Sequence, residues 1–162
     1  MKNKKVMFVT QAAMIAAIYV VLGVVFAAFG SKAIQVRLAE ALTILPVFTG
    51  AAIPGLFVGC LLSNILAGGI LPDVIFGSLA TFIGAVGTYK LGKVHPVFGT
   101  LPPIIANTII VPFVLRYGYG EPFPIPYMMM TVGIGEIISC GVLGMILYVA
   151  LKPMKSRIFR NL

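Results

Sequence analysis

The sequence predicts an all-α integral membrane protein, a six-transmembrane-helix bundle with both termini in the cytoplasm. Of its 162 residues, 60% are hydrophobic and only 10% are charged, with a mean hydropathy of +1.09, whereas a soluble domain carries about 25% charged residues. The apolar residues form long runs that are separated by charges, glycine or proline. Basic residues gather at alternate connections between these runs, which is typical of multi-pass membrane proteins.

Six apolar segments account for nearly the whole chain, and we expect each to cross the membrane. A span needs about 20 mostly apolar residues. We place the spans at about residues 7–28, 38–49, 53–71, 74–90, 97–115 and 127–151, within a single membrane domain over 1–162. The second span is short because it runs directly into "PVFTGAAIPG". The first is too long for the core of a signal peptide, so we expect no cleavage after it.

The placement of lysine and arginine predicts the orientation. With the N-terminus in the cytoplasm, nine of the 12 basic residues fall on the cytoplasmic side, and the others, Lys32, Arg37 and Arg116, fall outside. That imbalance predicts cytoplasmic termini and a place in the cell (cytoplasmic) membrane. The net charge of +8 therefore indicates membrane topology, and we expect no nucleic-acid partner.

The acidic residues all fall in the predicted outer half of the bundle or near its midplane: Glu40, Asp73, Glu121 and Glu136. Glu136 lies within the sixth span, about 14 Å from its outer end at a rise of about 1.5 Å per residue. A charge at the centre of a membrane helix costs about 2.5–3.5 kcal/mol on insertion scales. Such a residue is by default a binding or transport site, although a protonated structural carboxyl would also explain it.

Other polar residues near these acids each have two interpretations. Asn64 and Asn107 lie inside predicted spans, where a buried amide needs partners and either binds a solute or holds two helices together. Arg37 and Glu40 are three residues apart, so they share one helix face as a local ion pair or as parts of a site. Asp73 follows Pro72 and either caps a helix or binds a ligand.

We expect these groups to form an outward-facing cavity of Glu136, Glu40, Asp73, Asn64, Asn107 and Arg37. Carboxylates accept hydrogen bonds, and amides both donate and accept them. The cavity therefore suits a small neutral or cationic solute that is rich in N–H donors, and it would repel a phosphate or a dicarboxylate. The aromatic residues of the outer loop either stack on a flat ring or form an interfacial belt: Tyr117, Tyr119, Phe123 and Tyr127. Of these we place Tyr117 among the substrate-binding residues.

The sequence carries no enzyme motif that we recognise. It has no G-x-x-x-x-G-K-[ST] phosphate loop, so we do not expect the chain to hydrolyse ATP through that motif. His95 is the single histidine, and we expect neither a metal site nor a cofactor. Cys60 and Cys140 lie in predicted spans, where they read as small core side chains without a disulfide framework.

The first span carries a pattern for contact with another helix. Ala12 and Ala16, and likewise Ala13 and Ala17, stand four residues apart. Small residues at this spacing let a second helix approach closely. We expect these alanines to form a partner interface.

Three segments carry a resemblance to a known family: "VRLAEALTILPVF" (36–48), "GLFVGCLLSNILAGGILPDVIFGSLAT" (55–81) and "VGIGEIISC" (132–140). Together with six short spans and the alanine-paired first helix, they resemble the QueT family of substrate-binding S components of energy-coupling factor (ECF) transporters. The resemblance runs over nearly the whole chain and is most specific in the first two segments.

The resemblance implies a function that the residues alone do not show. Proteins of this type capture a vitamin-like solute outside the cell and pair with a transmembrane scaffold subunit and two ATPase subunits. The implied solute is a queuosine precursor or a related 7-deazaguanine, whose N–H donors a carboxylate such as Glu136 can accept. The alanines of the first helix would contact the scaffold, and ATP hydrolysis in the partners would drive import.

Three alternatives stay open at this point. The chain could be an S component for another vitamin-like solute. It could be a small ion-coupled transporter or channel in which Glu136 carries the proton. It could also be a structural bundle that organises another complex and binds no small molecule.

Overall fold

The computed structural model describes residues 2–26 and 36–159, and within these ranges the chain is helical with no strand. The end of the first predicted span, residues 27–28, lies outside the described residues, as do Lys32 and Arg160. The prediction of an all-α protein is confirmed.

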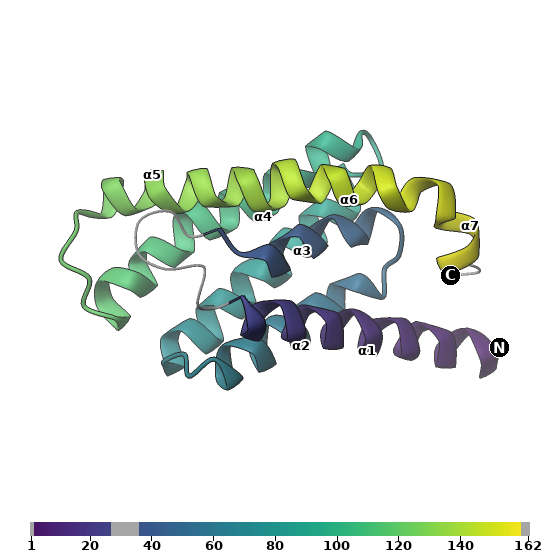
Figure 1. Cartoon of the computed structure of the whole chain (residues 1–162), viewed down its shortest axis with the longest axis horizontal. Helices are drawn as coiled ribbons and strands as arrows, with labels where there is room; N and C mark the ends of the chain where they lie inside the picture. The colour runs from purple at the N-terminus through teal and green to yellow at the C-terminus, as the bar shows by residue number, and fades with distance from the viewer. Residues whose placement is uncertain (1, 27–35, 160–162) are drawn as a thin grey trace.

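The helices follow the apolar segments in order. Short 3₁₀ and π segments, labelled η, extend or interrupt several of them. The elements are α1 (Lys2–Val25), η2 (Leu38–Val47), α2 (Ala52–Leu66), η3 (Asp73–Gly77), α3 (Ser78–Leu91), α4 (Pro96–Phe113), η4 (Val114–Gly118), α5 (Ile125–Glu136), η5 (Ile137–Leu143), α6 (Gly144–Leu151), η6 (Lys152–Met154) and α7 (Lys155–Ile158). The segments from α5 to α6 form one long helical rod along one side of the bundle, α7 turns away at its end, and α1 runs along the other side (Figure 1).

Four helical stretches are long and apolar enough to cross a membrane: Lys4–Val25, Asp73–Leu91, Pro96–Gly118 and Ile125–Ile158. The second and third predicted spans correspond to shorter apolar helices, Leu38–Val47 and Ala52–Leu66. The count of six spans and the cytoplasmic side of the termini therefore stay predictions. The start of α1 and the end of α7 do lie at the same end of the bundle (Figure 1).

The two short helices end where the sequence contains turn-forming residues. Pro46 lies inside η2, which is a tight 3₁₀ helix that ends one residue later, at Val47. Proline has no backbone N–H, so it cannot donate a hydrogen bond that would continue the helix. Helix α2 stops at Leu66 instead of the predicted 71, because Gly68 adopts a φ of 75°. Gly68 and Gly69 then donate back to the carbonyls of Ile65 and Asn64, the arrangement that ends many helices at a glycine.

Close helix contacts depend on missing side chains. A Cβ atom on Gly55 would lie 2.7 Å from the backbone oxygen of Ala12, and one on Gly59 would lie 3.1 Å from the Cα of Ala16. These glycines therefore let α1 and α2 approach closely. Gly84 of α3 lets that helix pack directly against Pro103 of α4 in the same way.

The segment η2 lies in the centre of the bundle. It contributes Ala39, Leu42 and Leu45 to a core with Ile15, Tyr19, Ala52, Leu56, Cys60 and Ala85. Many large apolar side chains on the outside of α1, α3, α4 and α6 are instead exposed. This inverted distribution fits helices that face lipid. The central position of η2 also carries the polar residues Glu40 and Thr43 into the core.

Candidate functional site: an open pocket and a buried polar cluster

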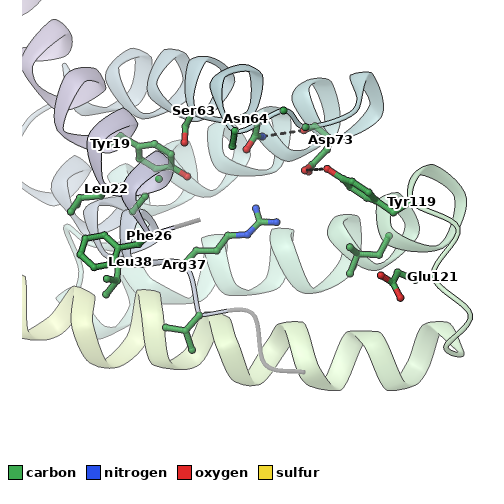
Figure 2. A pocket seen from close by; sticks show the side chains of 17 residues that line it. Tyr19, Leu22, Phe26, Arg37, Leu38, Ser63, Asn64, Asp73, Tyr119 and Glu121 are labelled. Atoms are coloured by element: carbon green, nitrogen blue, oxygen red, sulfur yellow. Dashed lines mark hydrogen bonds between the residues drawn. The ribbon is translucent and has the colours of Figure 1, made fainter. Parts of the chain in front are cut away.

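A pocket of about 400 Å³ lies between the last turns of α1, the start of η2, the end of α2 and the connection that follows η4. Figure 2 shows its side chains. Its apolar wall includes Leu22, Leu38 and Leu115. The polar side chains that line it are Tyr19, Arg37, Ser63, Asn64, Asp73, Tyr119 and Glu121.

Asp73 is held on two sides. Its carboxylate Oδ2 accepts a hydrogen bond of 2.9 Å from the Tyr119 hydroxyl, and its backbone oxygen accepts one of 3.2 Å from the Asn64 amide. It lies in the first turn of its helix, where the helix dipole favours a negative charge. A Cβ atom on Gly77 would lie only 3.0 Å from Asp73 Oδ1, so the glycine makes room for the carboxylate.

The Tyr119 phenol stays a hydrogen-bond donor at neutral pH. Burial raises its pKa, and the hydrogen bond to Asp73 and the charge of Asp73 raise it further. All three effects disfavour the phenolate. Tyr119 therefore presents a neutral hydroxyl to the pocket and orients the carboxylate of Asp73.

Arg37 supplies the cation of the pocket. It stands at the N-terminal boundary of η2, and its backbone N–H donates to Ser139 Oγ at 3.0 Å. Its guanidinium points into the pocket toward Asn64 and Asp73 (Figure 2). Within the described residues it forms no ion pair with any carboxylate, including the ion pair with Glu40 that the sequence allowed, so its N–H groups face the pocket as donors.

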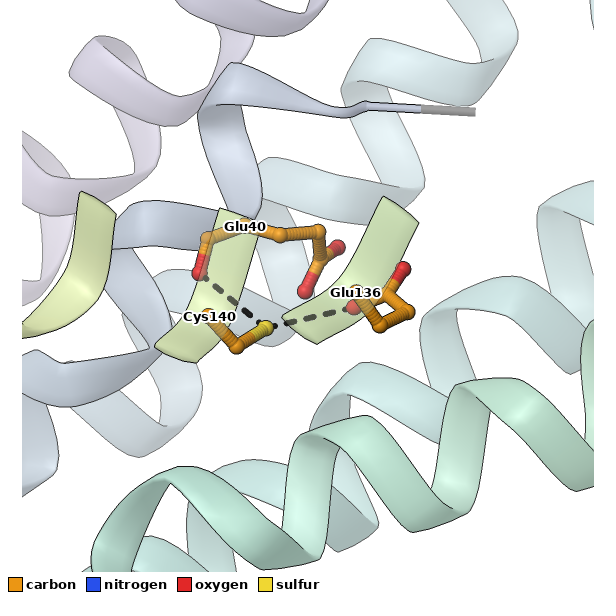
Figure 3. Close-up of side chains that lie close together, drawn as sticks. All are labelled: Glu40, Glu136 and Cys140. Atoms are coloured by element: carbon orange, nitrogen blue, oxygen red, sulfur yellow. Dashed lines mark hydrogen bonds between the residues drawn. The ribbon is translucent and has the colours of Figure 1, made fainter. Parts of the chain in front are cut away.

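A second polar group, the buried polar cluster, consists of Glu40, Glu136, Asn107 and Cys140. Each of these residues is at most 2% exposed. The ligand-type atoms of Glu40, Glu136 and Cys140 all lie within 4.8 Å of one another, as Figure 3 shows. The cluster joins η2, α4 and the junction of α5 with the π segment η5, and such π segments are frequent at functional sites.

Hydrogen bonds hold most of this cluster. Glu40 Oε1 accepts from the Tyr19 hydroxyl and, at 3.4 Å, from Thr81. Cys140 Sγ lies 3.2 Å from Glu136 Oε2 and 3.3 Å from Thr43 Oγ1. The carboxyl oxygens of Glu40 and Glu136 and the sulfur of Cys140 are close enough together to hold a metal ion. In this structure the Cys140 sulfur instead takes part in hydrogen bonds with Glu136 and Thr43.

The cavity predicted from the sequence is therefore two adjoining groups. Arg37, Asn64 and Asp73 line the open pocket, whereas Glu40, Glu136 and Asn107 are in the buried polar cluster. Tyr19 belongs to both, since it lines the pocket and bonds to Glu40. The sequence gives no sign of this link, because Tyr19 reads there as one more aromatic residue in an apolar helix.

Tyr117 lies outside the pocket, although it was expected to face the solute. Its side chain is 77% exposed and stacks on Phe113. Tyr119, two residues further on, lines the pocket instead. Residues two apart on a helical turn point about 200° apart, so only one of the two tyrosines can face inward. Cys140 could have been found from the sequence, since it stands one helical turn after Glu136.

The alanines of α1 divide between two faces. Ala16 is buried and Ala12 is half-buried, and both pack against the glycines of α2. Ala13 and Ala17 are exposed. Only the second pair is thus open to a helix from another protein.

Comparison with known proteins adds the family. The family model described as QueT transporter matches residues 9–153, which is nearly the whole chain. The chain belongs to the QueT transporter family. This confirms the family that the sequence resembles. No curated protein and no solved structure matches the chain. As a QueT family member it is a transporter protein, and its long apolar helices fit a place in a membrane.

Proposed function

We propose that this QueT family protein is the substrate-capture S component of an ATP-driven ECF importer. In this proposal it takes a queuosine precursor or a related 7-deazaguanine from the outer face and delivers it inward. The family match over residues 9–153 carries the proposal. The pocket supports it, because about 400 Å³ lies within the range of roughly 300–1,000 Å³ typical of small-molecule sites.

The chemistry of the pocket suits a flat base with a polar or cationic substituent. Asp73 would pair with the aminomethyl group of a precursor that carries one, with Tyr119 holding the carboxylate in place. Arg37 and Asn64 offer hydrogen-bond donors to a base while it lies in the open pocket. Glu136 and Glu40 would accept the N–H groups of the base, so that its polar edge points toward the buried polar cluster.

The energy for import would come from separate partner subunits, a transmembrane scaffold and two ATPases. The sequence has no G-x-x-x-x-G-K-[ST] phosphate loop, the motif whose backbone N–H groups and lysine hold the phosphates of ATP. The exposed Ala13 and Ala17 would contact the scaffold, because small side chains allow close helix approach in a membrane. We place the protein in the cytoplasmic membrane as a multi-pass subunit.

A binding titration on the purified chain in detergent tests the proposal. The panel contains 7-deazaguanine, its aminomethyl form, guanine, riboflavin and thiamine. We expect saturable binding of the deazaguanines, with the aminomethyl form weakened about ten-fold or more by Asp73→Asn, since one lost charge-assisted hydrogen bond is worth about 1.5–3 kcal/mol. Thr88→Val, which removes a buried hydroxyl at the other end of α3, is the control and should bind like wild type.

Other results of the titration, or of a flux assay in liposomes, would favour one of the alternative functions. Saturable binding of riboflavin or thiamine alone would make the chain an S component for another vitamin. Proton-driven flux in liposomes without any partner subunit would favour an ion-coupled transporter, a function for which the buried Glu136 is the specific observation. In that case Glu136→Gln would abolish the flux, whereas a capture subunit shows no such flux at all.

A further inference from the structure

Tyr19 separates the open pocket from the buried polar cluster. Its ring lines the pocket, and its hydroxyl donates to Glu40 Oε1. The residue is itself only 3% exposed. Glu40, Glu136 and Asn107 do not line the pocket. A ligand that enters the pocket in this conformation therefore meets the ring of Tyr19 before it can reach the carboxyl group of Glu40.

Behind Tyr19, one acceptor and one donor are left without partners. Glu40 Oε2 makes no hydrogen bond, and neither does Asn107 Nδ2, within the described part of the chain. The two residues are 0% and 1% exposed. The Asn107 amide lies within hydrogen-bonding reach of the carboxyl groups of both Glu40 and Glu136, but its Nδ2 atom forms a well-aligned hydrogen bond with neither. Buried polar groups are almost always paired, so in another state these two atoms pair either with each other or with a guest that offers one donor and one acceptor.

We propose that Tyr19 is a gate, and that Glu40 Oε2 and Asn107 Nδ2 read the lactam edge of a base once the gate opens. A lactam edge presents an N–H donor next to a carbonyl acceptor. The N–H would donate to Glu40 Oε2, and the carbonyl would accept from Asn107 Nδ2. This deepens the proposed function and rests on it, because it assumes that the solute is a guanine-type base that first occupies the open pocket.

The arrangement makes the site selective for one edge. An adenine-type base carries the reversed pattern, a ring nitrogen acceptor beside an amino donor. It would bring two acceptors together at Glu40 and two donors together at Asn107. A buried site that is built to hydrogen-bond one pattern rejects a mismatched one strongly. We expect 7-deazaguanine to bind at least about 100-fold more tightly than 7-deazaadenine.

The variant Glu40→Gln tests the edge reading directly. The Tyr19 hydroxyl, which donates to Oε1, would keep the amide oxygen at that position, and this places an N–H₂ donor where Oε2 stood. The lactam N–H would then face another donor. We expect the preference for 7-deazaguanine over 7-deazaadenine to fall about ten-fold or more. Asn107→Leu, which removes the donor at similar volume, should weaken 7-deazaguanine by about ten-fold.

The variant Tyr19→Phe tests the gate. It keeps the ring and removes the hydroxyl that holds Tyr19 on Glu40. We expect 7-deazaguanine to associate about five-fold faster or more, because opening no longer breaks a hydrogen bond to a carboxyl group. Tyr148→Phe is the matched control. Tyr148 stacks on Phe48 and does not line the pocket, so removing its hydroxyl should leave the association rate of 7-deazaguanine unchanged.

Three results would overturn the proposal, and they separate it from the proposed function. If Glu40→Gln and Asn107→Leu bind both bases like wild type while Asp73→Asn weakens the aminomethyl base, the solute stays in the open pocket and only the edge reading fails. If the wild type binds both bases equally, the edge reading fails even where the variants do not fold. If the folded chain binds no deazaguanine, the proposed function fails as well. A water bridging Glu40 and Asn107 is the explanation that the first result would favour.

Discussion

At the scale of single residues, the pocket is organised by one carboxylate and its neighbours. The sequence identified Asp73 and Arg37 as charged residues at the boundary of an apolar segment, and Asn64 as a polar amide inside one. It could not identify Tyr119 over Tyr117, since that choice depends on the turn of the backbone through η4. It also could not show that Tyr19 donates to Glu40, because the two residues are 21 positions apart and meet only in the fold.

Tyr119→Phe should remove the hydrogen bond to Asp73 and lower the stability of the protein slightly, without unfolding it. The hydroxyl donates to Asp73 from a side chain that is 44% exposed, so we expect the free energy of unfolding to fall by about 1 kcal/mol. Unfolding curves in detergent measure this change. A loss of several kcal/mol would show that Tyr119 supports more of the fold than this one hydrogen bond.

The same bond gives a pH dependence with a definite sign. The pKa of Tyr119 is raised in the folded state, so its contribution is fully present below the unfolded pKa of about 10. It is lost as the pH rises through the folded pKa. The stability difference between wild type and Tyr119→Phe should therefore shrink as the pH rises above about 10. A difference that grows with pH would contradict this assignment.

At the scale of elements, the sequence predicts where helices lie better than where they end. The apolar runs mark the helices from α1 to α6, because burial and lipid contact both demand apolar side chains, whereas the short helix α7 lies beyond the last run. The end of α2 was placed too late, since residues 67–71 look apolar while Gly68 turns the chain in the left-handed region. The central position of η2 could not be predicted from its own residues. For that reason the close approach of the Glu40 and Glu136 side chains was expected only as part of a loose cavity.

Gly55→Ala should loosen the contact of α1 with α2. The added Cβ would lie 2.7 Å from the Ala12 carbonyl oxygen and 3.1 Å from the Ile15 side chain. Overpacking of this kind costs about 1–3 kcal/mol, and a lower midpoint of thermal unfolding would report it. Gly141→Ala is the control, because its nearest neighbour lies at 3.8 Å. Equal stability of the two variants would contradict the packing described here.

At the scale of the whole molecule, one face of α1 is closed and the other is open. Ala17→Leu should leave binding of 7-deazaguanine unchanged and reduce assembly with a scaffold subunit, because a bulky side chain blocks close helix approach. Co-purification of the tagged scaffold from membranes measures the assembly. Ala16→Leu should instead destabilise the chain itself, since Ala16 packs against Gly59. Undiminished assembly of Ala17→Leu would move the partner contact to another face.

The central claim is that this QueT family protein captures a guanine-type base through the open pocket and the buried polar cluster. Calorimetric titration of 7-deazaguanine into the purified, folded wild type, with Glu136→Gln beside it, tests this most directly. The account predicts saturable binding of one base per chain that weakens about ten-fold or more in the variant. Binding that is equally tight in Glu136→Gln would contradict the role of the buried carboxyl, and no saturable binding in the wild type would contradict the function.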